Sequence, residues 1–202
     1  YTDCIANYYH TTAFSKKHWQ CIESYLRTAV EHGINMIMTP VFTPELDTYV
    51  GGERLTTQLV DIELTADGTY VFGFDKLHQW IDLALKCGVQ YFEIPHFFTQ
   101  WGAKAAPKIV VKVNGRRQKY FGWHTESTGE KYKNFLAQFI PALVCMLAVV
   151  ILIIAGFTYY TSVAQDEPFK SRFLEMATIS ISVAVMSFIV GVLAKKFLGV
   201  DL

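Results

Sequence analysis

Apolar residues recur at helical spacing in two segments of the first half of the chain. In residues 15–32 the apolar positions follow Ser15, a good helix N-cap, and stop before a glycine. In residues 75–87 the apolar positions are spaced i, i+3, i+4 and i+7, with Asp75 as the expected cap and a glycine again at the end. We therefore expect two amphipathic helices, each ended by a glycine.

A short apolar run follows each of these helices. Residues 34–40 and 89–95 have the length of strands and lack clean alternation, which is typical of strands covered on both faces. Helix, glycine turn and buried strand thus occur twice in succession. Such an alternation predicts an α/β fold in which the two strands are parallel.

Long segments follow both predicted strands, and each contains a predicted β-hairpin. Residues 58–64 and 69–74 alternate around an Ala-Asp-Gly turn, and residues 108–113 and 116–120 flank Asn114-Gly115, a strong signal for a two-residue hairpin turn. Large insertions after strands, with short turns before them, are typical of a (β/α)₈ barrel. We expect residues 1–142 to supply about three βα units of such a barrel, with hairpin insertions.

Polar and aromatic side chains gather after the ends of these strands, where a (β/α)₈ barrel carries its site. Carboxylate, amide and imidazole groups can bond sugar hydroxyls, while aromatic rings cover the apolar face of a sugar. The candidate substrate-binding residues are Asp3, His10, Arg54, Glu93, His96, Gln100 and Trp101. For Glu93 the alternative is a buried, paired carboxylate, and for His10 a cap or loop residue. Phe97 and Phe98 are expected in the core.

The chain changes character near residue 143. Residues 134–165 contain 32 positions without Asp, Glu, Lys or Arg, and residues 176–194 are also uncharged. At about 1.5 Å per residue the first run is too long for one membrane span of about 20 residues. We expect residues 128–143 to form a soluble helix, with Tyr132, Phe135, Phe139 and Leu143 on one face. Two spans, 146–164 and 176–194, then form a transmembrane hairpin in a second domain, residues 143–202.

The second predicted span carries small residues on one face, which lets membrane helices approach closely. These residues are Ala177, Ser180, Ala184, Ser187 and Gly191. We therefore expect a lipid bilayer and further transmembrane helices as partners. Four lysines near the termini side of the spans outnumber Lys170 and Arg172 in the turn, so we expect a multi-pass membrane protein with both termini cytoplasmic.

Composition excludes several other classes of protein. The formal net charge is zero, so no basic field exists to attract nucleic acid. The four cysteines form no C-x-x-C pair, and we expect neither a metal site nor a cofactor. Position 1 is Tyr rather than Met, which indicates a fragment or a processed chain.

Four segments of the first domain resemble the catalytic domain of uncharacterised glycoside-hydrolase-like proteins, which are similar to glycoside hydrolase family 123. They are residues 2–9 (TDCIANYY), 32–37 (HGINMI), 50–58 (VGGERLTTQ) and 96–103 (HFFTQWGA). The resemblance implies a (β/α)₈ barrel that acts on glycans. It also implies a retaining, substrate-assisted mechanism in which an adjacent Asp-Glu pair serves on a later strand.

This chain departs from that pattern. Its only adjacent acidic pair, Asp166-Glu167, lies between the two apolar runs, and three strands cannot close a barrel. We therefore assign no catalytic residue and expect no glycosidase activity from the chain alone.

Residues 146–202 resemble the last two helices of vacuolar-iron-transporter-like proteins, some of which carry a rubrerythrin-like domain. The segments concerned are 157–164, 168–177 and 195–200. Three interpretations remain open: a truncated glycoside-hydrolase-like protein with a membrane tail, a fragment of an iron or manganese transporter behind a foreign N-terminus, and a chimeric reading frame without a selected function.

Overall fold

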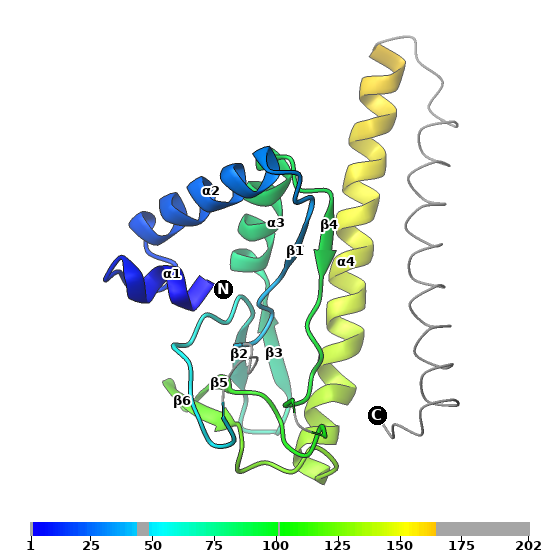
Figure 1. The fold of residues 1–202 in the computed structure, drawn as a ribbon. Coiled ribbons are helices and arrows are strands. Elements are labelled where there is room, and N and C mark those ends of the chain that lie inside the picture. Colours follow the sequence, from blue (N-terminus) through cyan, green and yellow to red (C-terminus); the bar gives the residue numbers. More distant parts are fainter. Residues whose placement is uncertain (1, 44–48, 101, 165–202) are drawn as a thin grey trace, which may run out of the picture. The chain divides into compact units, whose positions relative to one another are not determined.

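A computed structural model describes residues 2–43, 49–100 and 102–164 of the 202-residue chain. The chain divides into two compact units, Tyr1–Ile140 and Pro141–Leu202. The first unit is mixed α/β (Figure 1). The elements in chain order are α1 Thr2–Tyr8, α2 Lys16–Glu31, β1 Met36–Met38, β2 Asp61–Leu64, β3 Tyr70–Gly73, α3 Asp75–Cys87, β4 Tyr91–Glu93, β5 Ile109–Val113, β6 Arg116–Phe121 and α4 Glu130–Ala164.

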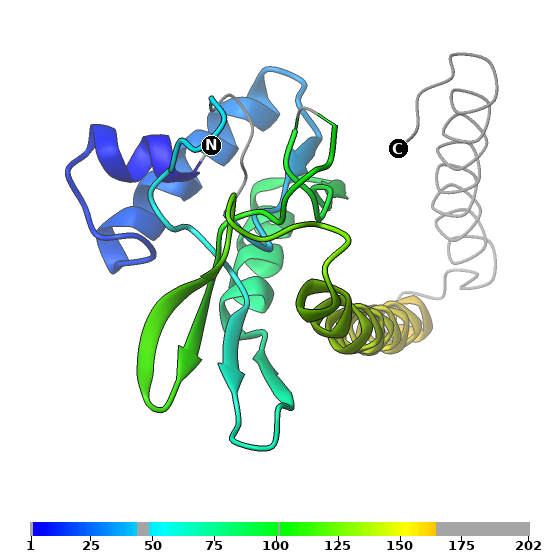
Figure 2. The same cartoon turned by 90° about the horizontal axis from the view of Figure 1, so that it is seen from below.

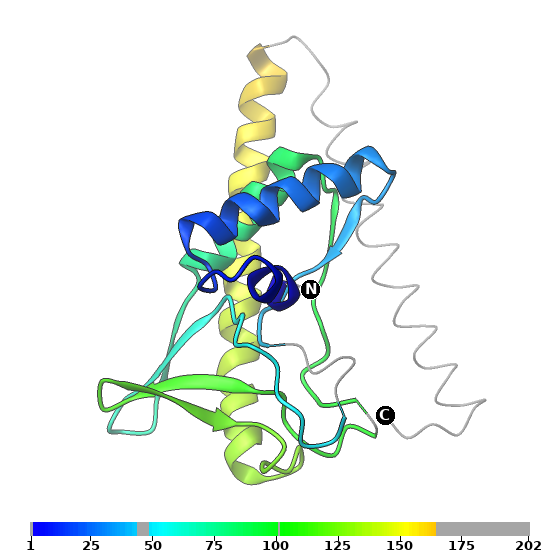
Figure 3. The same cartoon turned by 60° about the vertical axis from the view of Figure 1, so that its left-hand side comes forward.

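Helix α2 forms where the apolar spacing predicts it. The Ser15 hydroxyl accepts a hydrogen bond from the backbone N–H of His18 at 3.2 Å, which satisfies one donor of the first turn. Ile22 and Leu26 are buried on one face. The helix ends before Gly33, whose φ of 84° lies in the left-handed region that favours glycine. Helix α1 packs against α2 (Figure 3).

Helix α3 buries Leu77, Trp80 and Ala84 at the predicted spacing. Its end is also as predicted, because the left-handed Gly88 donates its backbone N–H to carbonyls of the last turn. The prediction that Asp75 caps this helix is wrong. The N-cap is Phe74, which makes no side-chain capping bond, while Asp75 lies in the first turn, where its charge complements the helix dipole.

Strands β1 and β4 pair in parallel, as predicted, with Met36 opposite Tyr91 and Met38 opposite Glu93. They are shorter than the segments 34–40 and 89–95, and the expectation that both faces are covered is wrong. Met36 is 54% exposed, and neighbouring Ile34 is also exposed. The reason is that β1 and β4 make a sheet of only two strands within the part of the chain that the structure describes. Within the described residues this sheet supplies two strands that each follow a helix, where about three βα units were expected.

Both predicted hairpins form, and they join each other. β2 pairs antiparallel with β3, and β5 pairs antiparallel with β6 through Asn114 (φ 50°) and Gly115 (φ 79°). β2 and β5 then pair in parallel, giving one four-stranded sheet in the order β3-β2-β5-β6. The two hairpins lie next to each other in Figure 2. The segments inserted after β1 and after β4 therefore form a single sheet together.

An aromatic cluster forms the core between this sheet and the start of α4. Phe135 lies at its centre, with ring centroids 5.1 Å from Tyr70, 5.0 Å from Phe121 and 5.8 Å from Phe42. Tyr132, Phe135 and Phe139 are fully buried, which confirms the predicted face of the helix. The amide oxygen of Gln138 accepts the backbone N–H of Tyr70 at 2.9 Å, so the helix also continues the hydrogen bonding of the sheet edge.

Helix α4 continues without a break through Pro141 to Ala164, so it contains both the predicted soluble helix and the predicted first span. Among the described residues, one helix, over Glu130–Val149, is long and apolar enough to cross a membrane by length and composition. Part of that stretch is apolar because it belongs to the core just described. The predicted turn, the second span 176–194 and its small-residue face lie outside the described residues, so a two-helix hairpin stays a prediction.

Candidate functional site

The carboxyl ends of β1 and β4 meet at one edge of their sheet, because the strands are parallel. The backbone N–H of Thr39 donates to the carbonyl oxygen of Glu93 at 2.8 Å, which joins the two exits. The chain after β1 then pairs with itself, with Leu59 donating to the carbonyl oxygen of Pro40 at 3.1 Å. An isolated antiparallel bridge links Thr43 to Lys108 in the segment after β4. Both long segments are therefore tied together at this edge.

Asp3 and Arg54 form a buried ion pair between α1 and the segment after β1. Arg54 Nε donates to Asp3 Oδ2 at 2.7 Å and Nη2 donates to Oδ1 at 3.0 Å, so the contact is bidentate. The Arg54 side chain is 10% exposed and the Asp3 side chain is 5% exposed. Burial would lower the pKa of Arg54, but the hydrogen bonds and charge of Asp3 outweigh it and the pKa is raised. The guanidinium is thus a fixed positive charge that holds α1 to this segment.

The Gly51–Arg54 segment is held in a tight turn. Gly51 has a φ of 85°, and a Cβ on Gly52 would lie 3.0 Å from the carbonyl oxygen of Tyr49. The indole N–H of Trp123 donates to the carbonyl oxygen of Gly52 at 2.8 Å. The positive φ favours glycine at position 51, and the close approach of the Tyr49 carbonyl favours it at position 52.

Two lysines pair with the carboxylate of Glu53 in this turn. Lys119 lies on β6, and Lys108 directly precedes β5. Glu53 pairs with Lys119 and, at 3.3 Å, with Lys108. The hydrogen bonds from Lys119 and then Lys108 lower the pKa of Glu53, so it stays ionised near neutral pH. Lys108 also donates to the carbonyl oxygen of Arg54 at 2.9 Å. The turn is consequently anchored from α1, from β6 and from the start of β5.

The remaining predicted site residues lie apart from this ion pair in the chain. Glu93 ends β4 and is exposed, so the alternative of a buried, paired carboxylate is wrong. His96 is exposed and Gln100 is half-buried, both in the segment after β4. His10 is exposed and has a φ of 46°, in the turn after α1. Trp101 lies outside the described residues. Asp3 and Arg54 are the two predicted residues that the structure joins by a direct contact.

Sequence reasoning missed several polar residues at this edge. Thr39, Thr43 and Thr57 are buried, and their hydroxyls have no hydrogen-bond partner among the residues that the structure describes. Gln58 is also buried, and its side-chain amide bonds the backbone of Val110 in both directions, at 3.0 and 2.9 Å. A polar residue in a predicted strand was the available signal for Gln58. Nothing in the spacing indicated the threonines.

Aromatic residues occur both in the core and on the surface of this unit. Phe97 is half-buried and packs 5.7 Å from Phe42, and Phe98 is also half-buried, so the two lie at the edge of the core rather than within it as predicted. Tyr8 is 75% exposed and Tyr49 is 79% exposed, so both present rings to solvent. Within the described residues, no group of three or more His, Cys, Asp or Glu side chains could hold a metal ion. The described residues can therefore bind a ligand by hydrogen bonding and ring stacking. The charges nearby, Asp3 with Arg54 and Glu53 with its two lysines, are already paired.

Comparisons with known proteins support the glycoside-hydrolase resemblance of the chain and not its resemblance to iron transporters. The sequence model described as glycoside hydrolase 123, catalytic domain, matches residues 1–179. Seven solved chains match the structure. One of them is a family 123 glycoside hydrolase from Clostridium perfringens, studied for glycolipid glycan hydrolysis. Its TM-score is 0.50, its identity is 15%, and the match covers 73% of this chain and 26% of that one. No curated protein matches the sequence.

The shared fold therefore spans about a quarter of that solved structure. The family match also runs across residues 143–146, where a join between unrelated genes was considered. None of these comparisons supports the resemblance of residues 146–202 to iron transporters. Because the family model covers most of the sequence, the chain belongs to the family of glycoside hydrolase 123 catalytic domains.

Proposed function

We propose that residues 1–142 are part of a (β/α)₈ barrel that binds a glycan at the carboxyl ends of β1 and β4. The family match carries this proposal, and the parallel pairing of β1 with β4 supports it. Each of these strands follows a helix and a left-handed glycine, as consecutive units of such a barrel do. Two strands alone leave Met36 and Ile94 exposed, and a closed barrel needs further strands beside them.

Polar residues at the end of β4 and in the segment after it are the proposed sugar ligands. Glu93, His96 and Gln100 offer a carboxylate, an imidazole and an amide to sugar hydroxyls, and Trp101 and His10 complete the proposed set. Asp3 and Arg54 have a different role in this proposal. Since each satisfies the other, they position the Gly51–Arg54 turn rather than contact the sugar with free groups.

Binding can be tested on the full chain with the neutral disaccharide lactose and with N-acetylhexosamines, by isothermal titration calorimetry. We expect Gln100→Ala and His96→Ala each to weaken binding about three- to tenfold, as expected for one lost hydrogen bond. His124→Ala is the matched control, because His124 is also an exposed histidine but precedes α4. Equal affinity of all three variants would exclude the strand-end site.

We further propose that the chain alone does not hydrolyse glycans. The residues at the ends of β1 and β4 include no adjacent Asp-Glu pair, and the chain spans 26% of the solved family member. A chromogenic N-acetylhexosaminide should give no turnover above background. Turnover that disappears in Glu93→Gln would refute this and would make Glu93 the general acid/base.

We also propose that residues 146–202 anchor the chain in a bilayer. The support is that residues 146–164 and 176–194 contain no Asp, Glu, Lys or Arg, and α4 carries exposed apolar side chains beyond Pro141, among them Val149, Ile151 and Leu152. The expected arrangement has two spans and cytoplasmic termini.

A further inference from the structure

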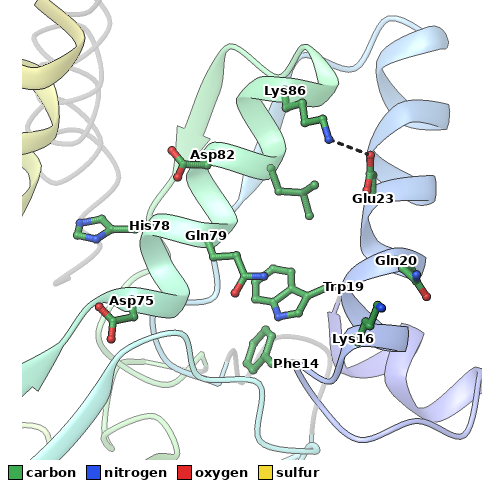
Figure 4. Close-up of a pocket in the computed structure, with 11 residues that line it drawn as sticks. Phe14, Lys16, Trp19, Gln20, Glu23, Asp75, His78, Gln79, Asp82 and Lys86 are labelled. Atoms are coloured by element: carbon green, nitrogen blue, oxygen red, sulfur yellow. Dashed lines mark ion pairs between the residues drawn. The ribbon is translucent and has the colours of Figure 1, made fainter. Parts of the chain in front are cut away.

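A groove of about 880 Å³ lies between α2 and α3, within the first unit (Figure 4). Its residues come from the turn before α2, from the first half of α2 and from α3. It contains none of the residues proposed above for the strand-end site. The proposed function therefore leaves this groove without a role.

One end of the groove is aromatic, and an unusual backbone conformation creates it. Phe14 has a φ of 58°, which is uncommon and strained for a bulky residue. The conformation is kept because the Phe14 N–H donates to His18 Nδ1 at 2.8 Å. It brings the Phe14 ring 5.2 Å from the Trp19 ring, with 34° between the ring planes. Both rings are partly exposed and line the groove.

The groove is lined by two lysines, Lys16 and Lys86, and by three carboxylates, Glu23, Asp75 and Asp82. Gln79 and Trp19 both line the groove, while Asp82 and His78 point away from the indole (Figure 4). At the other end Glu23 pairs with Arg27 at 2.6 Å and with Lys86 at 3.9 Å. Because its carboxylates outnumber its lysines, the groove does not select an anion. Its aromatic rings and amide instead suit a neutral molecule with one apolar face and a hydroxylated edge.

We propose that this groove binds a neutral sugar residue of a glycan, at a second site separate from the strand-end site. The apolar face of the sugar ring stacks on Trp19 beside Phe14, and the amide of Gln79 bonds its hydroxyls. The proposal rests on the proposed glycan function, because that function makes sugars the relevant ligands. A second site would hold a polymeric or lipid-linked glycan while another residue of it occupies the strand ends.

Fluorine NMR of the full chain with 5-fluorotryptophan can test the groove directly. The chain has four tryptophans, so each signal can be assigned by replacing one tryptophan with phenylalanine. Trp19 reports on the groove, and Trp123, bonded to the carbonyl of Gly52, reports on the strand-end segments. N-acetylglucosamine, N-acetylgalactosamine and lactose are the probes, in a detergent without a sugar headgroup.

We expect sugar to shift the Trp19 signal, with an apparent affinity about three- to tenfold weaker in Gln79→Ala. Tyr25→Ala is the control, because Tyr25 is an exposed aromatic residue of the same helix that does not line the groove. It should leave the Trp19 titration unchanged. A shift of Trp123 alone supports the strand-end function and overturns the groove site. A Trp19 titration unaffected by Gln79→Ala also overturns it, and no shift at either tryptophan overturns both sites.

Discussion

At the residue scale, Asp3 and Arg54 show that a buried polar residue can have a structural role where its type suggests ligand binding. Both were predicted as sugar ligands from their residue types and positions. In the structure their fork-to-fork contact uses the polar atoms that a sugar would need. The sequence could not indicate this, because the partners are 51 positions apart and no periodicity links them. Glu93 and His96 are exposed at the end of β4 and just after it, so their assignment as sugar ligands stays a prediction.

Removing one partner of this pair should strongly destabilise the first unit. We expect Asp3→Asn to lower the free energy of unfolding by about 3 kcal/mol, because it leaves the Arg54 guanidinium buried without its counter-charge. Urea denaturation followed by near-UV circular dichroism measures the change. Glu23→Gln is the control, since its pair with Arg27 is exposed and screened by solvent, so its loss should cost much less stability. Equal losses in the two variants would contradict a special role for the buried pair.

His18 should make the first unit sensitive to mild acid. Its side chain is fully buried, Nδ1 accepts the N–H of Phe14, and Nε2 lies 2.9 Å from the carbonyl oxygen of Thr2, to which it donates in the neutral form. Burial lowers the pKa of His18, and the bond to Thr2 only partly offsets this effect. The unfolded chain then binds a proton below about pH 6.5 that the folded chain does not bind. Stability is therefore complete above this pH and falls as the pH decreases towards the lowered pKa.

The slope of this decrease has an upper limit of about 1.4 kcal/mol per pH unit for one proton. The free energy of unfolding of the native chain is measured between pH 7.5 and 5, in steps of roughly half a pH unit. Its slope against pH should approach this limit. His18→Gln keeps polar contact but does not titrate, so its profile should be flatter over the same range. Identical profiles for the two proteins would assign the acid sensitivity to other groups.

At the scale of elements, the helices and hairpins could be predicted from the sequence because the residues that determine them are close together in the chain. The capping serine, the glycine ends and the Asn-Gly turn each act within a few residues, and the corresponding elements are α2, α3 and the β5-β6 hairpin. The parallel pairing of β2 with β5 was not predicted. Backbone hydrogen bonds between two hairpins leave no periodic pattern, so the four-stranded sheet could not be derived from sequence.

The two left-handed glycines that end α2 and α3 allow a matched test of element boundaries. Gly33→Ala should cost about 1 kcal/mol from backbone strain alone, because a Cβ there meets nothing within 4 Å. Gly88→Ala should cost more, since its Cβ would also lie 3.1 Å from Val30 Cγ1 on α2. Thermal unfolding of both variants gives the difference. A smaller loss for Gly88→Ala would show that the contact between α2 and α3 relaxes freely.

At the scale of the whole molecule, the chain joins a family fold to a strongly apolar segment. The start of α4 is apolar because Tyr132, Phe135 and Phe139 complete an aromatic core, as the helical spacing predicted. That explanation does not extend to residues beyond Pro141, where exposed Ile151 and Leu152 belong to the second unit. Hydropathy alone treats the two parts of α4 alike, and only burial separates them.

Membrane insertion of this second part makes a definite prediction about topology. Both termini should lie in the cytoplasm, because Lys131, Lys133, Lys195 and Lys196 flank the proposed spans on that side, against Lys170 and Arg172 in the turn. Single cysteines are introduced at Ser171 or Asp201 after the four native cysteines have been replaced by serine. In intact cells an impermeant thiol reagent should label the first and not the second.

The two alternatives give different labelling patterns. Label at position 201 but not at 171 would reverse the orientation, which a four-to-two excess of basic residues opposes only moderately. Equal labelling of both positions would exclude two spans, because residues 176–194 would then not separate them. Equal labelling that persists in cell lysate without any membrane-bound fraction would place the apolar segment in a protein core instead. In that case residues 143–179 would continue the hydrolase fold that the family match covers.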